Sequence, residues 1–298
     1  MAELAPLHAA LRRHERLVVA FSGGADSAFL ARVAHDALGP GRVHAVTAVS
    51  PSLPADELEA CRELASEWGL HWTTVATDEM ERAAYRVNDG ERCYHCKAAL
   101  MDALEPLRGE GAAIALGVNV DDLGDHRPGQ RAAGERAAVF PLVEAGFTKA
   151  DVRSWSQRLG LRTWDKPSAA CLASRLPYGT EVSVAVLSRV ERAEAELKRL
   201  GFAAVRVRHY DRTARIEVPL EDLPAIVASR ADVCEAVKAA GYEYVTLDLE
   251  GLRSGNLNAA LPRLTRRADG GGPVDGYGRA GAARSSAAPP HRPSRSRP

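Results

Sequence analysis

A short apolar run followed by a glycine-rich loop constrains the fold of this chain more than any other feature. Residues 17–21 read LVVAF, an uninterrupted hydrophobic stretch typical of a strand that is buried on both faces. The polar loop Ser22-Gly23-Gly24-Ala25-Asp26-Ser27 comes next, and apolar residues with helical spacing continue from residue 25 to about residue 38. A strand, a loop and a helix in this order predict the first unit of a parallel α/β sheet.

The alternation of strands and helices continues to about residue 160. Three more apolar runs are strand candidates, at residues 43–49, 71–75 and 112–117. Helical spacing occurs at residues 56–68 and 148–159, and Thr148 is a candidate N-cap for the second of these helices. We therefore expect residues 1–160 to form an α/β domain with a doubly wound parallel sheet.

The rest of the chain is predicted to contain a hinge, a second domain and a tail. Residues 161–181 have few periodic apolar residues and are expected to form a hinge loop that carries Cys171. A smaller α/β domain is predicted for residues 182–261. Its expected helices and strands cover residues 182–200, 203–207, 215–218, 220–240 and 244–249. Residues 262–298 are rich in Gly, Pro, Ser and Arg, and we expect them to be disordered.

Charge is balanced over the whole chain but not along it. The formal net charge is zero, yet the tail has eight arginines and two aspartates, a net charge of +6, which leaves −6 for residues 1–261. An acidic body argues against a nucleic-acid partner. The first 17 residues lack a signal-peptide pattern, and no apolar run reaches the roughly 20 residues that cross a bilayer. Five cysteines in 298 residues do not predict a disulfide framework, so we expect a cytoplasmic protein with free, catalytic or metal-binding thiols.

The loop from Ser22 to Ser27 has the properties of a phosphate-binding site. Its two glycines let an anion approach the backbone, and the helix N-terminus behind them offers free N–H groups. No lysine follows the glycines, so the loop is not a Walker A motif. It resembles the PP-loop of the ATP pyrophosphatases, which assigns ATP to Ser22, Gly23, Gly24 and Ser27, and Mg²⁺ to Asp26. The alternative is a glycine turn that only permits tight packing of strand and helix.

A cluster of polar residues follows the fourth predicted strand. Asn119 and Asp122 lie in the stretch GVNVDDLGDHRPG, just after residues 112–117. Open α/β sheets bind ligands at the carboxyl ends of their strands, so these side chains are candidates for binding Mg²⁺ or a ribose. A polar surface loop is the alternative.

Three of the cysteines lie in unusual surroundings. Cys93 and Cys96 are three residues apart in the stretch RCYHC, a spacing that can ligate one metal ion or one iron–sulfur cluster. Cys171 lies in a loop with proline and serine, four residues before Arg175, whose positive charge would favour the Cys171 thiolate. From the residues alone, each pattern also allows a purely structural role.

Taken together, the motifs resemble one family. The PP-loop, RCYHC, GVNVDDLGDHRPG, FPLVEAGFTKADVR and TWDKPSAACLASRLPYGT are similar to the LarE family of ATP-dependent sulfur transferases, over about residues 11–258. The resemblance implies an adenine nucleotide alpha hydrolase-like fold and assembly into homo-oligomers. It also implies a reaction in which the carboxylates of pyridinium-3,5-dicarboxylate mononucleotide are adenylated and become thiocarboxylates, in the biosynthesis of the nickel-pincer nucleotide cofactor. Cys171 matches the sulfur-donor cysteine of the family.

The resemblance leaves two candidates for the sulfur source. In sacrificial members of the family, the cysteine that matches Cys171 gives up its own sulfur and becomes dehydroalanine. This chain also has Cys93 and Cys96, as in the three-cysteine branch of the family, and three thiolates suit a 4Fe–4S cluster with one open iron. We favour the cluster, with all three sulfurs facing one cleft beside the PP-loop, and keep a sacrificial Cys171 as the alternative. Arg175 is assigned to catalysis in the same motif.

Arginines of the second domain are candidates for binding the phosphate of the substrate. Arg206, Arg208 and Arg215 lie on or beside its predicted strands, close to His209. In the LarE family arginines of this region bind a phosphate, and the geometry of a guanidinium group suits that ligand. Ordinary solvated charges on a sheet are the alternative.

Two other functions agree with parts of the sequence. A PP-loop tRNA thiolase also combines such a loop with three cysteines, but it needs a basic RNA-binding surface, and residues 1–261 are acidic. An ATP-binding regulatory module would leave the three cysteines of the motifs unexplained. Incubation with ATP and Mg²⁺ separates this module from the enzymes, because a regulator would not release pyrophosphate in response to substrate.

The Arg-rich tail lies outside the resemblance, so truncation after Leu264 is expected to leave activity intact. The measurement compares pyrophosphate release and product formation by the truncated and the full chain at equal protein concentration. A clear loss of either activity would show that the tail contributes to the reaction.

Overall fold

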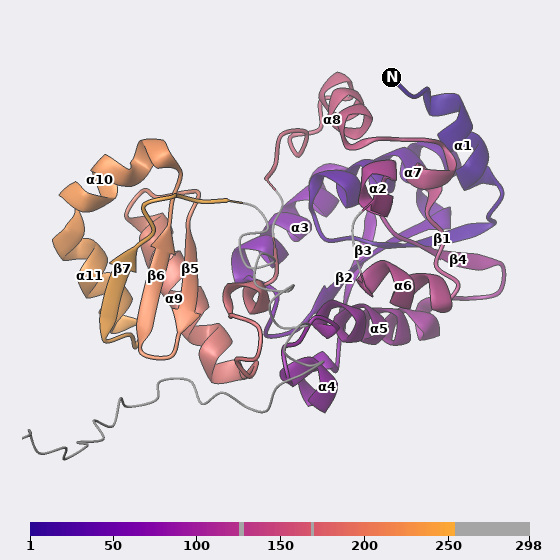
Figure 1. Ribbon diagram of the computed structural model, residues 1–298. Helices are drawn as coiled ribbons and strands as arrows, with labels where there is room; N and C mark the ends of the chain where they lie inside the picture. Colours follow the sequence, from indigo (N-terminus) through magenta and orange to yellow (C-terminus); the bar gives the residue numbers. More distant parts are fainter. Residues whose placement is uncertain (125–127, 168–169, 254–298) are drawn as a thin grey trace, which may run out of the picture. The chain divides into compact units, whose positions relative to one another are not determined.

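The computed structural model describes residues 1–124, 128–167 and 170–253, and its first sheet contains the four predicted parallel strands (Figure 1). Their bounds are β1 (Arg16–Ala20), β2 (Val43–Val49), β3 (His71–Ala76) and β4 (Ala112–Ala115). The strand order is β3-β2-β1-β4. β1 is central, because it pairs in parallel with β2 on one side and with β4 on the other. The predicted parallel sheet is confirmed.

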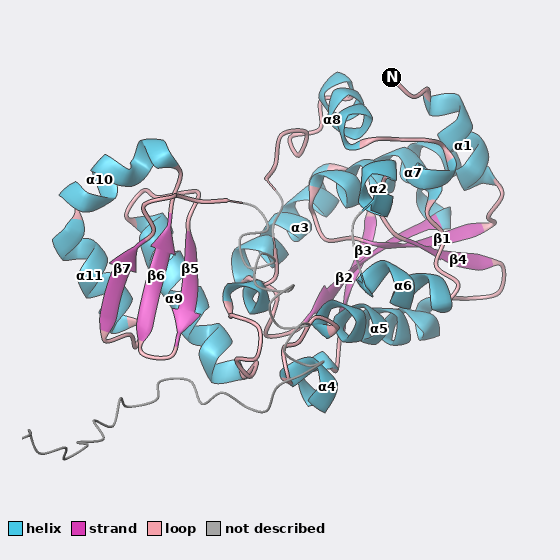
Figure 2. Cartoon of the chain, viewed as in Figure 1, coloured by secondary structure: helices cyan, strands magenta, loops and turns pink. Residues whose placement is uncertain are grey.

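Helices pack against both faces of this sheet (Figure 2). One group consists of α1 (Leu4–Arg12), α2 (Ala25–Leu38), α3 (Ala55–Glu67), α7 (Pro141–Glu144) and α8 (Lys149–Arg158). The opposite group consists of α5 (Arg92–Leu104) and α6 (Pro128–Glu135), and the short α4 (Ala83–Arg86) precedes α5. Neighbouring side chains of a strand point to opposite faces. Leu17 and Val19 of β1 therefore join the core of the first group, and Val18 joins that of the second.

The start of α8 agrees with its sequence signal. Thr148 Oγ1 accepts a hydrogen bond from the backbone N–H of Asp151 at 3.2 Å, and Asp151 Oδ2 accepts one from the backbone N–H of Thr148 at 3.1 Å. This reciprocal pair is a capping box, which satisfies two N–H groups that the first helical turn leaves free. The predicted N-cap is confirmed, and it fixes the position of Lys149, the first residue of the helix.

A second sheet follows in the chain, with the order β5-β6-β7. β5 (Arg206–Tyr210) is antiparallel to β6 (Thr213–Glu217), and β6 is parallel to β7 (Tyr244–Leu247). α9 (Val184–Arg199) and α11 (Arg230–Ala239) pack on one face, where Ala193, Val207 and Val237 belong to one core. The prediction of a single helix over residues 220–240 is wrong. Backbone angles at Ser229 (φ −89°, ψ 19°) leave the helical range and separate α10 (Leu223–Ala228) from α11.

The segment between α8 and α9 has little regular structure. Of the predicted hinge, 161–181, the structure describes all but residues 168–169, and it contains the short 3₁₀ helix Leu172–Arg175. The boundaries of hinge and domains stay predictions. The predicted disordered tail, 262–298, lies outside the described residues. None of the described helices is both long enough and apolar enough to cross a membrane.

Candidate active site

The glycine-rich loop lies between the end of β1 and the start of α2, as the sequence predicts. Gly23 has a φ of +66°, and a Cβ at this position would lie 2.8 Å from Cys61 Sγ, so the loop requires a glycine there. Gly24 is the N-cap of α2. Ser27 Oγ accepts from the backbone N–H of Ser22 at 3.2 Å, donates to the Gly24 carbonyl at 3.1 Å and lies 3.0 Å from Ser22 Oγ. These bonds fix the loop around a helix N-terminus, where backbone N–H groups favour an anion.

Asp26 is the charged centre of the loop and contacts two side chains from distant segments. Its carboxylate forms an ion pair with Lys149 Nζ, and its Oδ1 accepts from Asn119 Nδ2 at 3.2 Å. Asn119 is buried, and its backbone N–H donates to Asp122 Oδ2 at 3.1 Å. The structure therefore brings Asn119 next to the PP-loop aspartate, while Asp122 fixes the backbone that carries Asn119.

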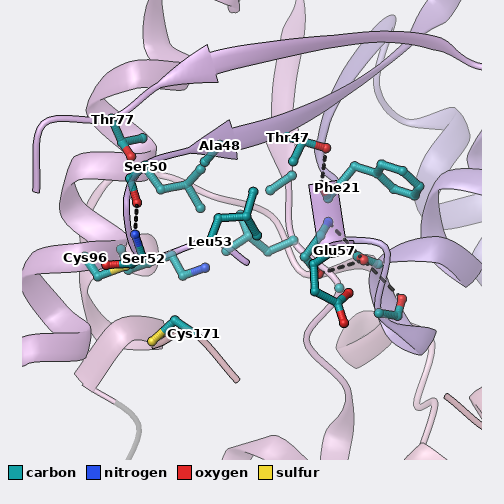
Figure 3. A pocket seen from close by; sticks show the side chains of 18 of the residues that line it. Phe21, Thr47, Ala48, Ser50, Ser52, Leu53, Glu57, Thr77, Cys96 and Cys171 are labelled. Atoms are coloured by element: carbon teal, nitrogen blue, oxygen red, sulfur yellow. Dashed lines mark hydrogen bonds between the residues drawn. The ribbon is translucent and has the colours of Figure 1, made fainter. Parts of the chain in front are cut away.

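A pocket of about 380 Å³ opens at the carboxyl ends of the parallel strands (Figure 3). Predicted residues that line it are Ser22, Gly24, Asp26, Ser27, Cys96 and Cys171. In Figure 3, Cys96 and Cys171 lie toward the same end as Ser52 and Thr77, whereas Phe21 and Glu57 lie at the other end. One cavity thus joins the phosphate-binding loop to two thiols.

The three cysteines are near one another but differ in environment. Cys93 is exposed and does not line the pocket, whereas Cys96 and Cys171 are half-buried and do. The expectation that all three sulfurs face one cleft beside the PP-loop therefore holds for Cys96 and Cys171 but not for Cys93. Burial, with a further contribution from Cys171, raises the pKa of the Cys96 thiol to about 12. Burial by itself would lower the pKa of Arg92. Electrostatic interactions with the neighbouring Cys171 and Cys93 outweigh burial, so the pKa of Arg92 is raised. Among the described residues, no three His, Cys, Asp or Glu side chains are grouped to hold a single metal ion.

Arg175 is buried and engaged with protein groups. Its Nε and Nη2 donate to the two carboxylate oxygens of Glu194 on α9, both at 2.9 Å. Its Nη1 donates to the carbonyls of Ala170 at 2.5 Å and Cys171 at 3.1 Å. A bidentate pair of this kind has fixed geometry. The structure therefore gives Arg175 contacts with the backbone of the Cys171 loop, and it does not line the pocket.

The three arginines of the second sheet share one face. Arg206 is opposite Glu217 in the β5–β6 register, and Arg208 is opposite Arg215. Arg208 Nη2 donates to Glu217 Oε2 at 2.8 Å, and Arg215 Nη2 donates to Glu217 Oε1 at 3.2 Å. Arg215 Nε also lies 3.5 Å from Asp248 Oδ2. Three arginines and two carboxylates leave one excess positive charge on this face, which favours a bound anion.

Arg206 differs from the other two. Burial, followed by the charges of Arg175 and Arg208, lowers its pKa. Within the described residues Arg206 makes no ion pair, and its Nη1 donates to the Arg253 carbonyl at 3.3 Å. No carboxylate of the described residues neutralises its charge, and its role in binding a phosphate stays a prediction.

Sequence reasoning did not assign several charged residues of the site. Lys149 pairs with Asp26, and Lys166 Nζ donates to the Gly23 carbonyl at 3.2 Å and to Glu57 Oε2 at 2.7 Å. Lys97 lines the pocket. Lys149 and Lys166 occur inside motifs that carry the family resemblance, and Lys97 directly follows RCYHC. Those positions were the only signal for them.

Comparison with known proteins agrees with this geometry. A family model described as NAD synthase matches residues 9–99, which contain the PP-loop. The chain is 36% identical to the pyridinium-3,5-bisthiocarboxylic acid mononucleotide synthase of Lactiplantibacillus plantarum over 261 residues, 87% of this chain and 95% of that protein. The chain belongs to the LarE family of PP-loop enzymes.

Two further relatives show how widely this LarE-family sequence is shared. An uncharacterized protein of Synechocystis is 46% identical over 258 residues, 84% of this chain and 94% of that protein. An uncharacterized protein of Methanocaldococcus jannaschii is 26% identical over 244 residues, 81% of this chain and 92% of that protein. Membership of the PP-loop ATP pyrophosphatases means that this LarE-family enzyme binds ATP.

Proposed function

We propose that this chain is a pyridinium-3,5-bisthiocarboxylic acid mononucleotide synthase. The observation that carries the proposal is the single pocket that contains PP-loop residues together with the thiols of Cys96 and Cys171. A PP-loop binds the pyrophosphate that leaves when ATP activates a carboxylate, and a thiol supplies or binds sulfur. Their common pocket supports a reaction in which an acyl adenylate meets a sulfur nucleophile.

The first proposed step is adenylation. A carboxylate oxygen of the substrate attacks the α-phosphorus of ATP, the bond from this phosphorus to pyrophosphate breaks, and an acyl adenylate forms. The hydroxyls of Ser22 and Ser27, which lie 3.0 Å apart, and the N-terminus of α2 would bind the departing pyrophosphate. Asp26 offers the carboxylate oxygens that Mg²⁺ prefers. Lys149, the ion-pair partner of Asp26, would then turn to the phosphates.

The second proposed step delivers sulfur. A sulfur nucleophile attacks the acyl carbon, and AMP leaves with the electron pair of the broken C–O bond. If Cys171 is the nucleophile, a thioester forms. Loss of the Cα proton and of the Cβ–S bond of Cys171 then yields the thiocarboxylate and dehydroalanine.

For the sulfur source we favour a 4Fe–4S cluster bound by Cys93, Cys96 and Cys171. The chemistry of the donors fits, because all three are thiols and Cys93 and Cys96 lie one turn apart on α5. A single metal ion needs sulfurs within about 4 Å of one another, whereas a cluster spreads its ligands over several irons. The cluster would present an exogenous sulfide for transfer.

The arginine face of the second sheet supports a mononucleotide as the substrate. Arg208 and Arg215 share the buried counter-ion Glu217, and Arg215 also pairs with Asp248. Arg206 has no carboxylate partner, and Arg208 Nε has no hydrogen-bond partner, within the described residues. A phosphate monoester would supply the missing negative charge. Assembly into a homo-oligomer and a cytoplasmic location remain predictions.

The test is incubation of the anaerobically purified protein with ATP, Mg²⁺ and pyridinium-3,5-dicarboxylate mononucleotide. We expect substrate-dependent AMP and pyrophosphate, and a product in which sulfur replaces carboxylate oxygen by mass spectrometry. Nicotinic acid mononucleotide, which lacks one carboxylate, is the control substrate. ADP and orthophosphate as products would contradict the proposal.

A further inference from the structure

The turn that carries Cys171, residues 170–175, is bound through its backbone by buried arginines. Arg175, at the end of the turn, and two arginines from distant segments, Arg92 and Arg208, each donate Nη1 hydrogen bonds to main-chain carbonyls of this turn. The bonds are Arg175 to Ala170 (2.5 Å) and Cys171 (3.1 Å), Arg92 to Ala173 (2.8 Å) and Arg208 to Ser174 (2.8 Å). Four consecutive or nearly consecutive carbonyls thus accept hydrogen bonds from guanidinium groups.

These arginines are fixed in turn by the core around them. Arg92, Arg175 and Arg208 are 6%, 7% and 3% exposed. Glu194 binds Arg175, and Glu217 binds Arg208, each as a buried ion pair. Arg92 has no carboxylate partner in the described part of the chain, and its Nη1 also donates to Asn88 Oδ1 at 2.6 Å. Because these bonds already fix the planar guanidinium groups, little further conformational entropy is lost when the groups bind the turn.

The opposite side of the turn is bound as well. The backbone N–H of Leu172 donates to the Ser52 carbonyl at 2.9 Å, and Ser52 lines the pocket. Ser52 Oγ lies 2.6 Å from the hydroxyl of the buried Tyr85. The turn is therefore held from both sides at the point where the Cys171 thiol meets the pocket.

We propose that Arg92, Arg175 and Arg208 are positioning residues that act together to hold the Cys171 thiol in the pocket that the PP-loop also lines. This inference rests on the proposed function and assigns residues to sulfur delivery that are separate from those of the PP-loop. None of the three arginines lines the pocket. They act on sulfur delivery through the backbone of Cys171, and adenylation at the PP-loop does not require Arg92 or Arg175, which have no part in binding the substrate phosphate. Glu194 has a positioning role as well. Its carboxylate binds Arg175 and also accepts a hydrogen bond from the backbone N–H of Val207 at 2.9 Å, so it connects the turn to β5.

The experiment compares Arg92→Lys and Glu194→Gln with the control Glu191→Gln. Glu191 lies on the same helix as Glu194, and its Oε1 accepts from the Ala55 backbone N–H at 2.8 Å, a bond that a glutamine oxygen can keep. We expect the two test variants to lower the rate of thiocarboxylate formation about a hundredfold, the effect of a displacement of about 1 Å. Substrate-dependent ATP–pyrophosphate exchange should stay within about twofold of the wild type, as should both activities of the control.

A readout without substrate makes the inference independent of the proposed reaction. In the ATP-free protein, peptide mass spectrometry follows the alkylation of Cys171 by iodoacetamide. We expect faster alkylation of Cys171 in both test variants, by about threefold or more, and an unchanged rate at Cys234, because only the turn is released. Thermal unfolding shows whether Arg92→Lys or Glu194→Gln fails to fold. If one of them does, the other variant tests the proposal.

Three outcomes would overturn the proposal. One is thiocarboxylate formation at the wild-type rate in both variants. The second is an equal loss of exchange and thiocarboxylate formation, which indicates a general structural role. The third is an unchanged alkylation rate at Cys171. If the wild type itself shows neither exchange nor product, the proposed function fails, while the alkylation rates still test the positioning of the turn.

Discussion

Replacement of Cys171 by alanine is expected to eliminate the thiolated product and to leave adenylation intact. Cys171 lines the pocket that contains the PP-loop, but no hydrogen bond of the loop depends on its thiol. Both sulfur sources need this sulfur, either as the nucleophile or as a cluster ligand. We expect no product above background by mass spectrometry, with ATP–pyrophosphate exchange within about twofold of the wild type. Cys234→Ala is the matched control, because Cys234 lies on α11 and does not line the pocket.

The variants Cys93→Ala and Cys96→Ala distinguish the two sulfur sources. If a cluster supplies sulfur, each variant loses bound iron and multiple turnover after anaerobic reconstitution. If Cys171 is sacrificial, each variant still completes a single turnover, and the protein then loses the mass of H₂S at Cys171. Thiolated product from Cys171→Ala itself would contradict both mechanisms.

Asp26→Asn is expected to reduce pyrophosphate release by about two to three orders of magnitude. Asparagine keeps the size of the side chain and can still accept the hydrogen bond from Asn119, but it removes the negative charge that Mg²⁺ requires. The side chain is partly exposed, at 21%, so the fold should tolerate the change. The measurement is ATP–pyrophosphate exchange over a range of Mg²⁺ concentrations, with thermal unfolding as a check on the fold.

The control for this variant lies on the same helix. Asp36→Asn removes an exposed carboxylate of α2 that pairs with Arg32 at 2.9 Å, far along the helix from the PP-loop. We expect its exchange rate to equal that of the wild type. A normal rate of ATP–pyrophosphate exchange in Asp26→Asn would show that Asp26 does not bind Mg²⁺. The loop from Ser22 to Ser27 would then contribute no acidic ligand.

The sequence predicted the parts of the fold that depend on local patterns. The strand at residues 17–21, the PP-loop and the capped start of α8 are encoded by neighbouring residues, and the structure has all three. The helix expected over residues 220–240 was wrong, because its apolar spacing continues through Ser229 although the backbone breaks there. Periodicity reports which side chains are buried and does not detect such a break.

The roles of the charged residues depended on contacts that no local pattern encodes. Arg175 looked free to act on a thiol, but its partner Glu194 comes from the next helix, 19 residues away. Lys149 and Asp26 are 123 residues apart, and only the capped start of α8 brings them together. A motif shows that a charge is present, whereas the fold decides whether a protein group already neutralises it.

The order of these segments along the chain has a consequence for biosynthesis. A growing polypeptide folds from its N-terminus, and the whole PP-loop sheet is complete at β4 (Ala112–Ala115). Arg208 and the two acidic partners, Glu194 and Glu217, emerge from the ribosome much later. An unfinished chain would therefore possess strands for nucleotide binding while its thiol-bearing turn still lacked restraint. The contacts that restrain this turn therefore depend on segments synthesised after the nucleotide-binding strands.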